Sequence, residues 1–387
     1  MHRFIALLLI LPLVGCAASS SVATPSPSSG AAAGPPLSTA ADAPPLSFPA
    51  PLYVLDNGQV ARIEPDGKSR ALVTKETIEV QGFPPVSTFA ISAQGTLAFV
   101  VGDLKADRLV LAGLRGEDRR VLYEHPDYQL SDLVWSLDGS QIYLRLLNNK
   151  QPPDIPSGIY RIELADGQLH LVRSDDPVDD PVNPSRTING YRPSAISPDG
   201  TRLLIEIYSL YYDGCRMGVM APSSGDIVHL TPATDLKTYC GDAIWSPDGM
   251  GIYFLVGTSQ GPSIWRADAA SGAAQPLTSL SVLARAPWQM PDGALRFVLV
   301  TRDVSAGKMQ FALAELALGQ SAPTIRAAAF SEPLGQVLWA ADGSGVVVSV
   351  VPTGKTADLR WVPVGGDPVS LPNTNNGIVD LAWGPHE

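Results

Sequence analysis

The sequence predicts an all-β protein, a seven-bladed β-propeller built from four-stranded blades. Composition is the first observation: 35 of the 387 residues are Gly, 35 are Pro and only 17% are charged, which suits many short strands joined by tight turns. The second is that pairs of apolar strands recur around Asp-Gly turns along the chain. The third is that no segment long enough for a helix has its apolar residues at helical spacing.

Six hairpins define the repeat. Their turn glycines are spaced 44, 61, 49, 44 and 50 residues apart: Gly95, Gly139, Gly200, Gly249, Gly293 and Gly343. This period is typical of a four-stranded blade. Glycine suits these turns because it adopts a positive φ angle without steric cost. We therefore expect each glycine to join the first two strands of a blade, with a second, weaker hairpin supplying strands three and four.

Tryptophan recurs at one position of the repeat. Trp135, Trp245 and Trp339 each stand four residues before the turn glycine, and we expect their rings to pack between neighbouring blades. Trp288 stands five residues before Gly293, which predicts a bulge in that strand.

The two ends of the repeat region complement each other. Residues 51–74 predict three strands and residues 377–387 predict only one, with Trp383 standing 44 residues after Trp339. We expect these ends to share one blade, because closing the ring in this way removes open sheet edges.

The turn sequences also carry a family resemblance. Residues 197–200 and 246–249 both read Ser-Pro-Asp-Gly, residues 136–139 differ at one position and residues 93–95 are degenerate. With the apolar strand that follows each turn, the chain resembles the TolB-like, WD40-like (PD40-type) propeller repeat over roughly residues 50–387. TolB's separate α/β domain has no counterpart here, so the resemblance implies a fold and not a partner.

The first residues predict export. Residues 1–15 combine a short positive head with an apolar stretch, as in a signal peptide. Residues 13–16, Leu-Val-Gly-Cys, resemble the lipobox of bacterial lipoproteins, which implies that Cys16 becomes the lipid-modified first residue. Residues 16–49 are almost all Ala, Ser, Thr, Pro and Gly after Cys16 and predict a disordered tether. We therefore expect a lipid-anchored protein of the cell envelope, on a periplasmic or extracellular face, with the choice between inner and outer membrane left open.

Charge and motif content exclude several classes of function. The formal net charge of −11 is unlike the clustered Lys and Arg that nucleic-acid binding requires. No pair among the five His residues has metal-ligand spacing, and no glycine-rich phosphate loop is present, so we expect neither metal nor cofactor. Residues 257–261 match the G-x-S-x-G pattern of hydrolases, but strands flank the match on both sides, which favours a hairpin loop.

One face of the predicted propeller stands out. The longest insertion, residues 174–193, lies beside loops that carry tyrosines, and Cys215 and Cys240 begin strands of adjacent blades at the same face. Since export leaves these two cysteines in an oxidising compartment, we expect them to form a disulfide. Long loops on a rigid scaffold commonly bind partners. The candidate binding face comprises Asp175, Asp176, Asp179, Asp180, Tyr191, Arg192, Tyr208, Tyr211, Tyr212, Asp213 and Tyr239.

Two alternatives stay open at this face. The acidic loop could simply be solvated, or Asp179 and Asp180 could hold Ca²⁺ through their oxygens. Because no catalytic constellation is evident, the sequence favours a monomeric, non-catalytic envelope lipoprotein that binds a protein or glycan partner. The alternative is a propeller hydrolase or lyase that acts on envelope or extracellular polymers.

Overall fold

The computed structural model describes fifteen parts of the chain: residues 47–77, 84–102, 106–150, 153–177, 187–209, 215–232, 238–258, 261–279, 282–303, 308–320, 322–327, 331, 334–350, 358–371 and 378–385. The predicted signal peptide, Cys16 and most of the tether lie outside them. So do Asp179, Asp180, Tyr211, Tyr212 and Asp213 of the candidate binding face. The described residues form strands and no helix, as the sequence predicted. Accordingly, no helix suited to crossing a membrane occurs in them.

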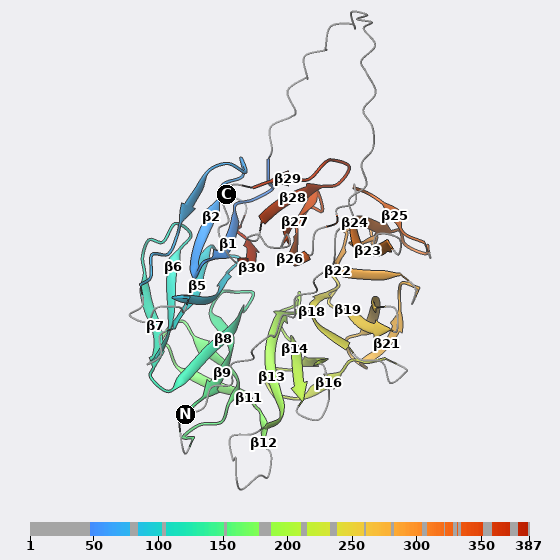
Figure 1. Ribbon diagram of the computed structural model, residues 1–387. Coiled ribbons are helices and arrows are strands. Elements are labelled where there is room, and N and C mark those ends of the chain that lie inside the picture. Colours follow the sequence, from blue (N-terminus) through green and yellow to red (C-terminus); the bar gives the residue numbers. More distant parts are fainter. Residues whose placement is uncertain are drawn as a thin grey trace, which may run out of the picture. The chain divides into compact units, whose positions relative to one another are not determined.

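The described residues form five antiparallel sheets of four strands and one larger sheet (Figure 1). The first contains β1 (Leu52–Asp56), β2 (Gln59–Ile63), β3 (Arg70–Leu72) and β30 (Ile378–Trp383). The next two contain β4 (Val86–Ile91), β5 (Thr96–Gly102), β6 (Asp107–Gly113) and β7 (Arg120–His125), then β8 (Tyr128–Trp135), β9 (Gln141–Asn148), β10 (Gly158–Glu163) and β11 (Leu169–Ser174). The last two contain β22 (Leu283–Gln289), β23 (Leu295–Asp303), β24 (Lys308–Leu316) and β25 (Thr324–Ile325), then β26 (Leu334–Trp339), β27 (Gly345–Val350), β28 (Asp358–Pro363) and β29 (Val369–Ser370).

A sixth sheet has ten strands. They are β12 (Asp176–Pro177), β13 (Thr187–Ile196), β14 (Leu203–Ser209), β15 (Cys215–Met220), β16 (Ile227–His229), β17 (Thr231–Pro232), β18 (Thr238–Trp245), β19 (Gly251–Thr258), β20 (Gly261–Asp268) and β21 (Ala273–Pro276). Strands β13–β16 and β18–β21 are two antiparallel groups of four. Between β15 and β18 the ladder consists of one pair, Cys215 with Thr238.

The predicted hairpin turns are confirmed. All six turn glycines have φ angles between 68° and 87°. In the Ser-Pro-Asp-Gly turn, Ser197 Oγ donates to Asp199 Oδ1 at 2.5 Å, and the same oxygen accepts the Thr201 amide at 3.0 Å. These hydrogen bonds lower the pKa of Asp199 to about 2, the Ser197 bond having the largest effect. The motif is therefore a turn in which a charged aspartate holds both sides of the loop.

Seven strands, which we call the inner strands, connect the sheets: β4, β8, β13, β18, β22, β26 and β30. Each contacts the next in chain order, and β30 contacts β4, so the contacts return to their start. In β27, the strand that follows the inner strand β26, every residue is buried. Such burial is expected of strands covered by a neighbouring sheet on each side.

Tryptophan side chains join neighbouring sheets at the inner strands. Trp339 Nε1 donates to the Ala286 carbonyl of β22 at 2.8 Å, and Trp383 Nε1 donates to the Trp339 carbonyl of β26 at 2.7 Å. Trp245 makes the corresponding bond to Ala195 of β13 at 3.5 Å. The rings of Trp245 and Trp339 are buried and that of Trp383 is partly buried, which confirms that these tryptophans pack between sheets.

The two ends of the folded unit meet in one sheet. β1 pairs with β2 on one side and with β30 on the other, and Leu52 lies opposite Trp383 (Figure 1). Phe48, which stands near the predicted end of the tether at residue 49, is buried with its ring centroid 5.3 Å from that of Trp361 and 5.8 Å from that of Trp383. This aromatic side chain gains burial by joining the core.

Candidate functional site

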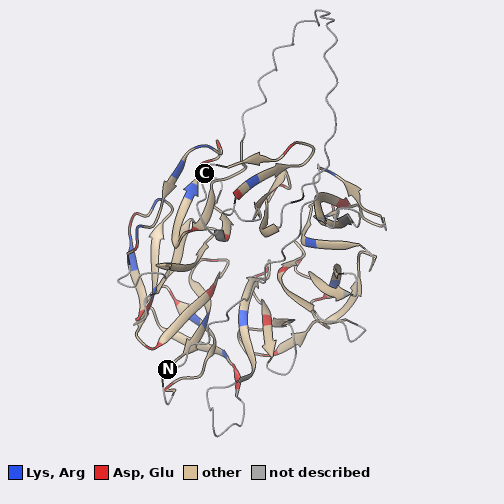
Figure 2. Ribbon diagram, viewed as in Figure 1, with Lys and Arg blue, Asp and Glu red and all other residues tan. Residues whose placement is uncertain are grey.

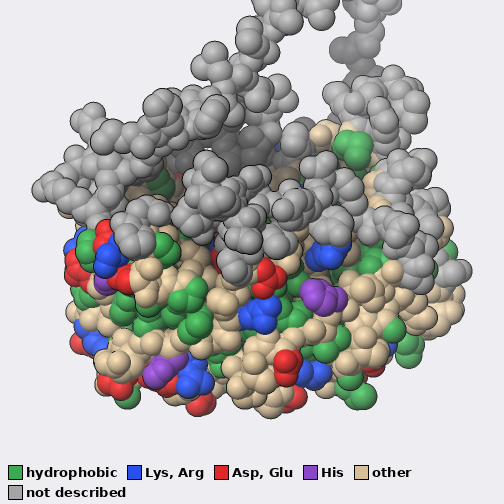
Figure 3. Space-filling view, turned by 90° about the horizontal axis from the view of Figure 1, so that it is seen from below, with side chains coloured by type: hydrophobic (Ala, Val, Ile, Leu, Met, Phe, Trp, Pro, Cys, Tyr) green, Lys and Arg blue, Asp and Glu red, His purple; other side chains and the backbone are tan. Residues whose placement is uncertain are grey.

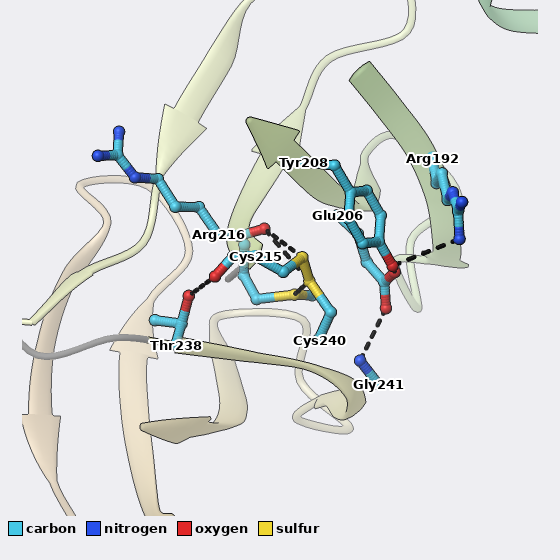
Figure 4. The surroundings of a disulfide bond; sticks show 9 residues. Arg192, Glu206, Tyr208, Cys215, Arg216, Thr238, Cys240 and Gly241 are labelled. Atoms are coloured by element: carbon cyan, nitrogen blue, oxygen red, sulfur yellow. Dashed lines mark hydrogen bonds between the residues drawn. A yellow bond between two sulfur atoms is a disulfide. The ribbon is translucent and has the colours of Figure 1, made fainter. Parts of the chain in front are cut away.

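The two cysteines of the candidate face are joined. Cys215 begins β15 and Cys240 lies in β18, and their sulfurs form a disulfide with the Cα atoms 5.5 Å apart (Figure 4). This confirms the pairing predicted from the sequence. Thr238 Oγ1 donates to the Cys215 carbonyl beside the bridge. The disulfide therefore reinforces the point where the ladder between two groups of strands is a single pair.

A polar network crosses the same point. Arg192 of β13 lies with its guanidinium 4.3 Å from the Tyr208 ring centroid of β14, and Tyr208 Oη donates to Glu206 at 2.5 Å. The other Glu206 oxygen accepts the Gly241 amide of β18 at 2.8 Å (Figure 4). Burial, followed by the hydrogen bond to Glu206, raises the pKa of Tyr208, which keeps its hydroxyl protonated at neutral pH. The network therefore links β13 and β14 to β18.

Part of this region is open to solvent. Arg192 is 45% exposed and Tyr239, next to the disulfide, is 47% exposed. We use the name disulfide surface for Arg192, Glu206, Tyr208, Tyr239 and Gly241 together with the Cys215–Cys240 bridge. It combines an exposed aromatic ring with fixed hydrogen-bonding groups on a crosslinked framework, a combination that favours binding at low entropic cost.

Of three other residues of the predicted face, Asp175 and Tyr191 are buried and Asp176 is partly buried. Asp175 is 5% exposed and accepts two hydrogen bonds from Arg145, at 2.5 and 2.6 Å. Tyr191 is 3% exposed and donates to Asp176 at 2.6 Å. Burial tends to raise the pKa of Asp176, but hydrogen bonds from Asn189 and Tyr191 and the charge of Arg173 outweigh it and lower that pKa. These groups hold the ends of the inserted loop instead of forming an exposed surface.

Sequence reasoning missed a set of three aspartates. Asp132, Asp242 and Asp380 each stand three residues before a tryptophan of an inner strand. Asp132 and Asp242 have φ angles of 53° and 52°, and in all three strands the pairing register shifts beside the aspartate. The repeated pattern Asp-x-x-Trp could have revealed them. The bulge predicted near Trp288 is confirmed by a register shift there, and it recurs in other inner strands.

Arginines of the next inner strand approach two of these aspartates. Arg285 Nε lies 3.0 Å from Asp242, and Arg192 Nε lies 3.8 Å from Asp132. Asp380 has no arginine within ion-pair distance in the described part of the chain, and it accepts only the adjacent Leu381 amide at 2.9 Å. Burial, assisted by the negative charge of Asp132, raises the pKa of Asp380 to about 6. A carboxyl group of this kind can exchange a proton near neutral pH.

Two other chemical readings are not supported by the geometry. Gly257 lies in β19 and Gly261 begins β20, so the G-x-S-x-G match lies in a hairpin and lacks the helix that a nucleophile elbow needs. Glu206 lies with the sulfurs of Cys215 and Cys240, all ligand atoms within 4.8 Å of one another. Because the sulfurs are bonded to each other, they are not thiolate ligands.

Charge is mixed over the described surface. Figure 2 shows acidic and basic residues interspersed along the strands. On the face drawn in Figure 3, acidic, basic and hydrophobic side chains alternate within the described residues, without a broad patch of one kind among them. This distribution gives no extended basic track for a phosphate backbone on that face.

The repeated turns, the linked antiparallel sheets and the shared terminal sheet define the fold as a β-propeller. No family model matches the chain, and no curated protein matches it in sequence. Among solved structures it is similar to an oligogalacturonate lyase in complex with manganese, with a TM-score of 0.58 and 13% identity over 79% of this chain and 82% of that chain.

Two further solved structures extend the comparison. A prolyl endopeptidase matches with a TM-score of 0.57 and 12% identity over 84% of this chain and 50% of that chain, so the chain spans half the length of that enzyme. TolB from Acinetobacter baumannii matches with a TM-score of 0.47 and 17% identity over 84% of this chain and 79% of that chain. At these identities the likeness concerns the fold alone.

Proposed function

We propose that this chain is a non-catalytic lipoprotein of the cell envelope whose seven-bladed propeller binds a protein or glycan partner at the disulfide surface. The lipobox-like residues ending at Cys16 support lipid anchoring, and a disulfide supports an oxidising compartment. The cyclic contacts of the seven inner strands and the pairing of β1 with β30 support a closed ring of seven blades.

The observation that carries the binding proposal is the network from Arg192 through Tyr208 and Glu206 to Gly241. It fixes polar groups across two groups of strands beside the exposed Tyr239. A partner meeting such a surface loses little entropy in ordering it, and exposed Tyr and Arg side chains commonly dominate binding energy.

Crosslinking in native membranes, followed by affinity purification of the full chain, tests this proposal. Tyr239→Ala should reduce recovery of the partner, since truncating an aromatic hot spot costs more than about 1 kcal/mol. Leu318→Ala is the matched control, because Leu318 is an even more exposed apolar side chain, at 80%, outside this surface. Identification of the captured material separates a protein from a glycan partner. Equal recovery of every captured molecule from wild type and Tyr239→Ala would reject the disulfide surface as the binding site.

One observation favours a second function, a propeller lyase or hydrolase. Asp380 and Asp132 are carboxyl groups of the same repeat position, and the pKa of Asp380 is raised to about 6, as a general acid or base requires. The likeness to an oligogalacturonate lyase supplies the substrate to try first. If this second function holds, the wild-type chain releases unsaturated products from oligogalacturonate and Asp380→Asn does not. The non-catalytic proposal predicts no product from either.

A further inference from the structure

A polar cavity of about 520 Å³ lies away from the disulfide surface, between the sheet of β1–β3 and the sheet of β4–β7. Residues 72–77, which end and follow β3, form one side. Arg108 and Ala112 of β6 and the β6–β7 turn form the other, with Phe99 of β5 in the lining. Cavities of this volume fall in the usual range for small-molecule sites.

The first side of the cavity is held by a buried hydrogen-bond network. Thr74 Oγ1 accepts the Val60 amide and donates to Gln59 Oε1, both at 2.8 Å. Gln59 Nε2 in turn donates to the Glu76 carbonyl at 2.7 Å, and Gln59 Oε1 accepts the Glu76 amide at 3.0 Å. The segment that carries Lys75 and Glu76 is therefore fixed to β2 before any ligand arrives.

The second side approaches the first too closely for an ordinary side chain. Gly116, in the β6–β7 turn, has a φ angle of 90°, and a Cβ atom there would overlap the carbonyl oxygen of Val73. Only glycine suits both the φ angle and this contact. The turn is thus seated against residue 73, which positions Arg115 and Arg119 on the rim of the cavity.

The lining has an excess of positive charge. It contains four cationic side chains, Lys75, Arg108, Arg115 and Arg119, and one carboxylate, Glu76. Arg119 pairs with Glu76 at 2.7 Å and Arg115 pairs with Glu64 at 3.4 Å, so the two remaining cations of the lining are Lys75 and Arg108, in a chain of net charge −11. Arg108 is half-buried on β6 and forms no ion pair with the described residues. A half-buried cation without a carboxylate partner is costly unless an anion approaches it.

We propose that this cavity binds a small organic anion that carries at least two phosphate or carboxylate groups. Arg108 and Lys75 contact the anionic groups, while Arg119, held by Glu76, closes the rim. The cavity is larger than a single phosphate requires, so the uncharged remainder of the ligand lies toward Ala112 and Phe99.

Isothermal titration calorimetry of the full chain with pyrophosphate and with citrate tests the proposal and separates the two anion types. We expect one of the two probes to bind at a single site, with affinity that falls as salt is added, because salt screens exposed charges. The double variant Lys75→Gln/Arg108→Gln should weaken that binding by about tenfold or more, equivalent to about 1.4 kcal/mol.

The matched control is Lys68→Gln/Arg120→Gln. It removes the same charge from exposed positions on the same two sheets without touching the cavity lining. Retained affinity in this control supports a local site. The single variants Arg108→Gln and Lys75→Gln separate a folding defect from a binding defect. Lys75 is exposed, so Lys75→Gln should leave the unfolding midpoint unchanged, and any loss of affinity in it reports binding alone. Absence of binding by both probes at millimolar concentration, or an equal loss in the control, would overturn the proposal.

Discussion

The carboxyl group of Asp380 responds to pH in a direction that its surroundings determine. Its ordinary pKa is 3.8, and burial and the Asp132 charge raise it to about 6. The folded protein therefore binds this proton more tightly than the unfolded chain does. The resulting stabilisation is complete below about pH 4 and is lost as the pH rises through about 6.

Asp380→Asn should abolish this pH dependence. At about 1.4 kcal/mol per pH unit, ionisation of Asp380 removes up to about 3 kcal/mol of folding free energy by pH 7. We expect the variant to be more stable than wild type at about pH 7 and similar to it at about pH 4 in urea unfolding. A stability difference that stays constant between these pH values would contradict the assigned pKa.

Asp175 and Arg145 form the buried ion pair most directly open to test. Asp175→Ala leaves the Arg145 guanidinium without its carboxylate in the interior, and such a loss typically costs about 3–5 kcal/mol. Lys150→Ala is the control, because it breaks the exposed pair with Asp154 and should change the free energy of unfolding little. Comparable losses in the two variants would mean that the Arg145 side chain reaches solvent when its partner is removed.

Sequence reasoning succeeded and failed at the residue scale for identifiable reasons. The turn glycines were predictable because a positive φ angle is a local requirement of the hairpin. The burial of Asp175 was not predictable, because its partner Arg145 stands 30 residues earlier, on β9. The raised pKa of Asp380 comes mainly from burial, with a smaller contribution from the charge of Asp132, and no local sequence pattern reports either.

The tryptophan bonds between inner strands act at the scale of the element. Trp339→Phe keeps an aromatic ring between β22 and β26 but removes the 2.8 Å hydrogen bond to Ala286. Trp245→Phe removes only the longer, 3.5 Å bond to Ala195. We therefore expect the Trp339 variant to lose about 1 kcal/mol more in denaturant unfolding than the Trp245 variant. Equal losses would show that ring volume, and not the hydrogen bond, dominates at both positions.

The disulfide joins two elements that share a single ladder pair. Replacing both Cys215 and Cys240 with Ser should lower the free energy of unfolding by roughly 3 kcal/mol, as expected for a loop closed across 25 residues. Because Tyr239 and Gly241 flank Cys240, hydrogen exchange of β18 should quicken more than that of β27. Thiol labelling of the denatured, unreduced wild type should find neither of these cysteines free. Labelling of both cysteines would show that the bridge does not form in the isolated protein.

The order of strands within each blade was predictable from the sequence, because each hairpin is local. The joining of β13–β16 to β18–β21 in one sheet was not predictable. That joining rests on the pair Cys215–Thr238 and on β17 running parallel to β21, both contacts between separate hairpins. The predicted candidate face includes residues of these strands, while the network from Arg192 to Gly241 is evident only in three dimensions.

At the scale of the whole molecule, the fold depends on a strand from the far end of the chain. β1 lies between β2 and β30, so deleting β30 exposes the backbone hydrogen-bonding groups along one side of β1. It also removes Trp383, whose ring packs on Phe48 and Trp361 and whose Nε1 donates a hydrogen bond to the Trp339 carbonyl. An exposed apolar edge of this kind pairs readily with other chains.

A chain truncated before Ile378 should therefore unfold at lower denaturant concentration than wild type and elute as oligomers in size-exclusion chromatography. The control removes only residues 386–387, so it keeps β30 and the hydrogen bond from the Gly384 amide to the Pro51 carbonyl. This control should remain monomeric and as stable as wild type. Adding the missing segment as a peptide of residues 377–387 should restore part of the lost stability, because it can pair with β1 as the native strand does. If the truncated chain stayed monomeric with an unchanged unfolding midpoint, the shared terminal sheet would not be what holds the ends of the propeller together.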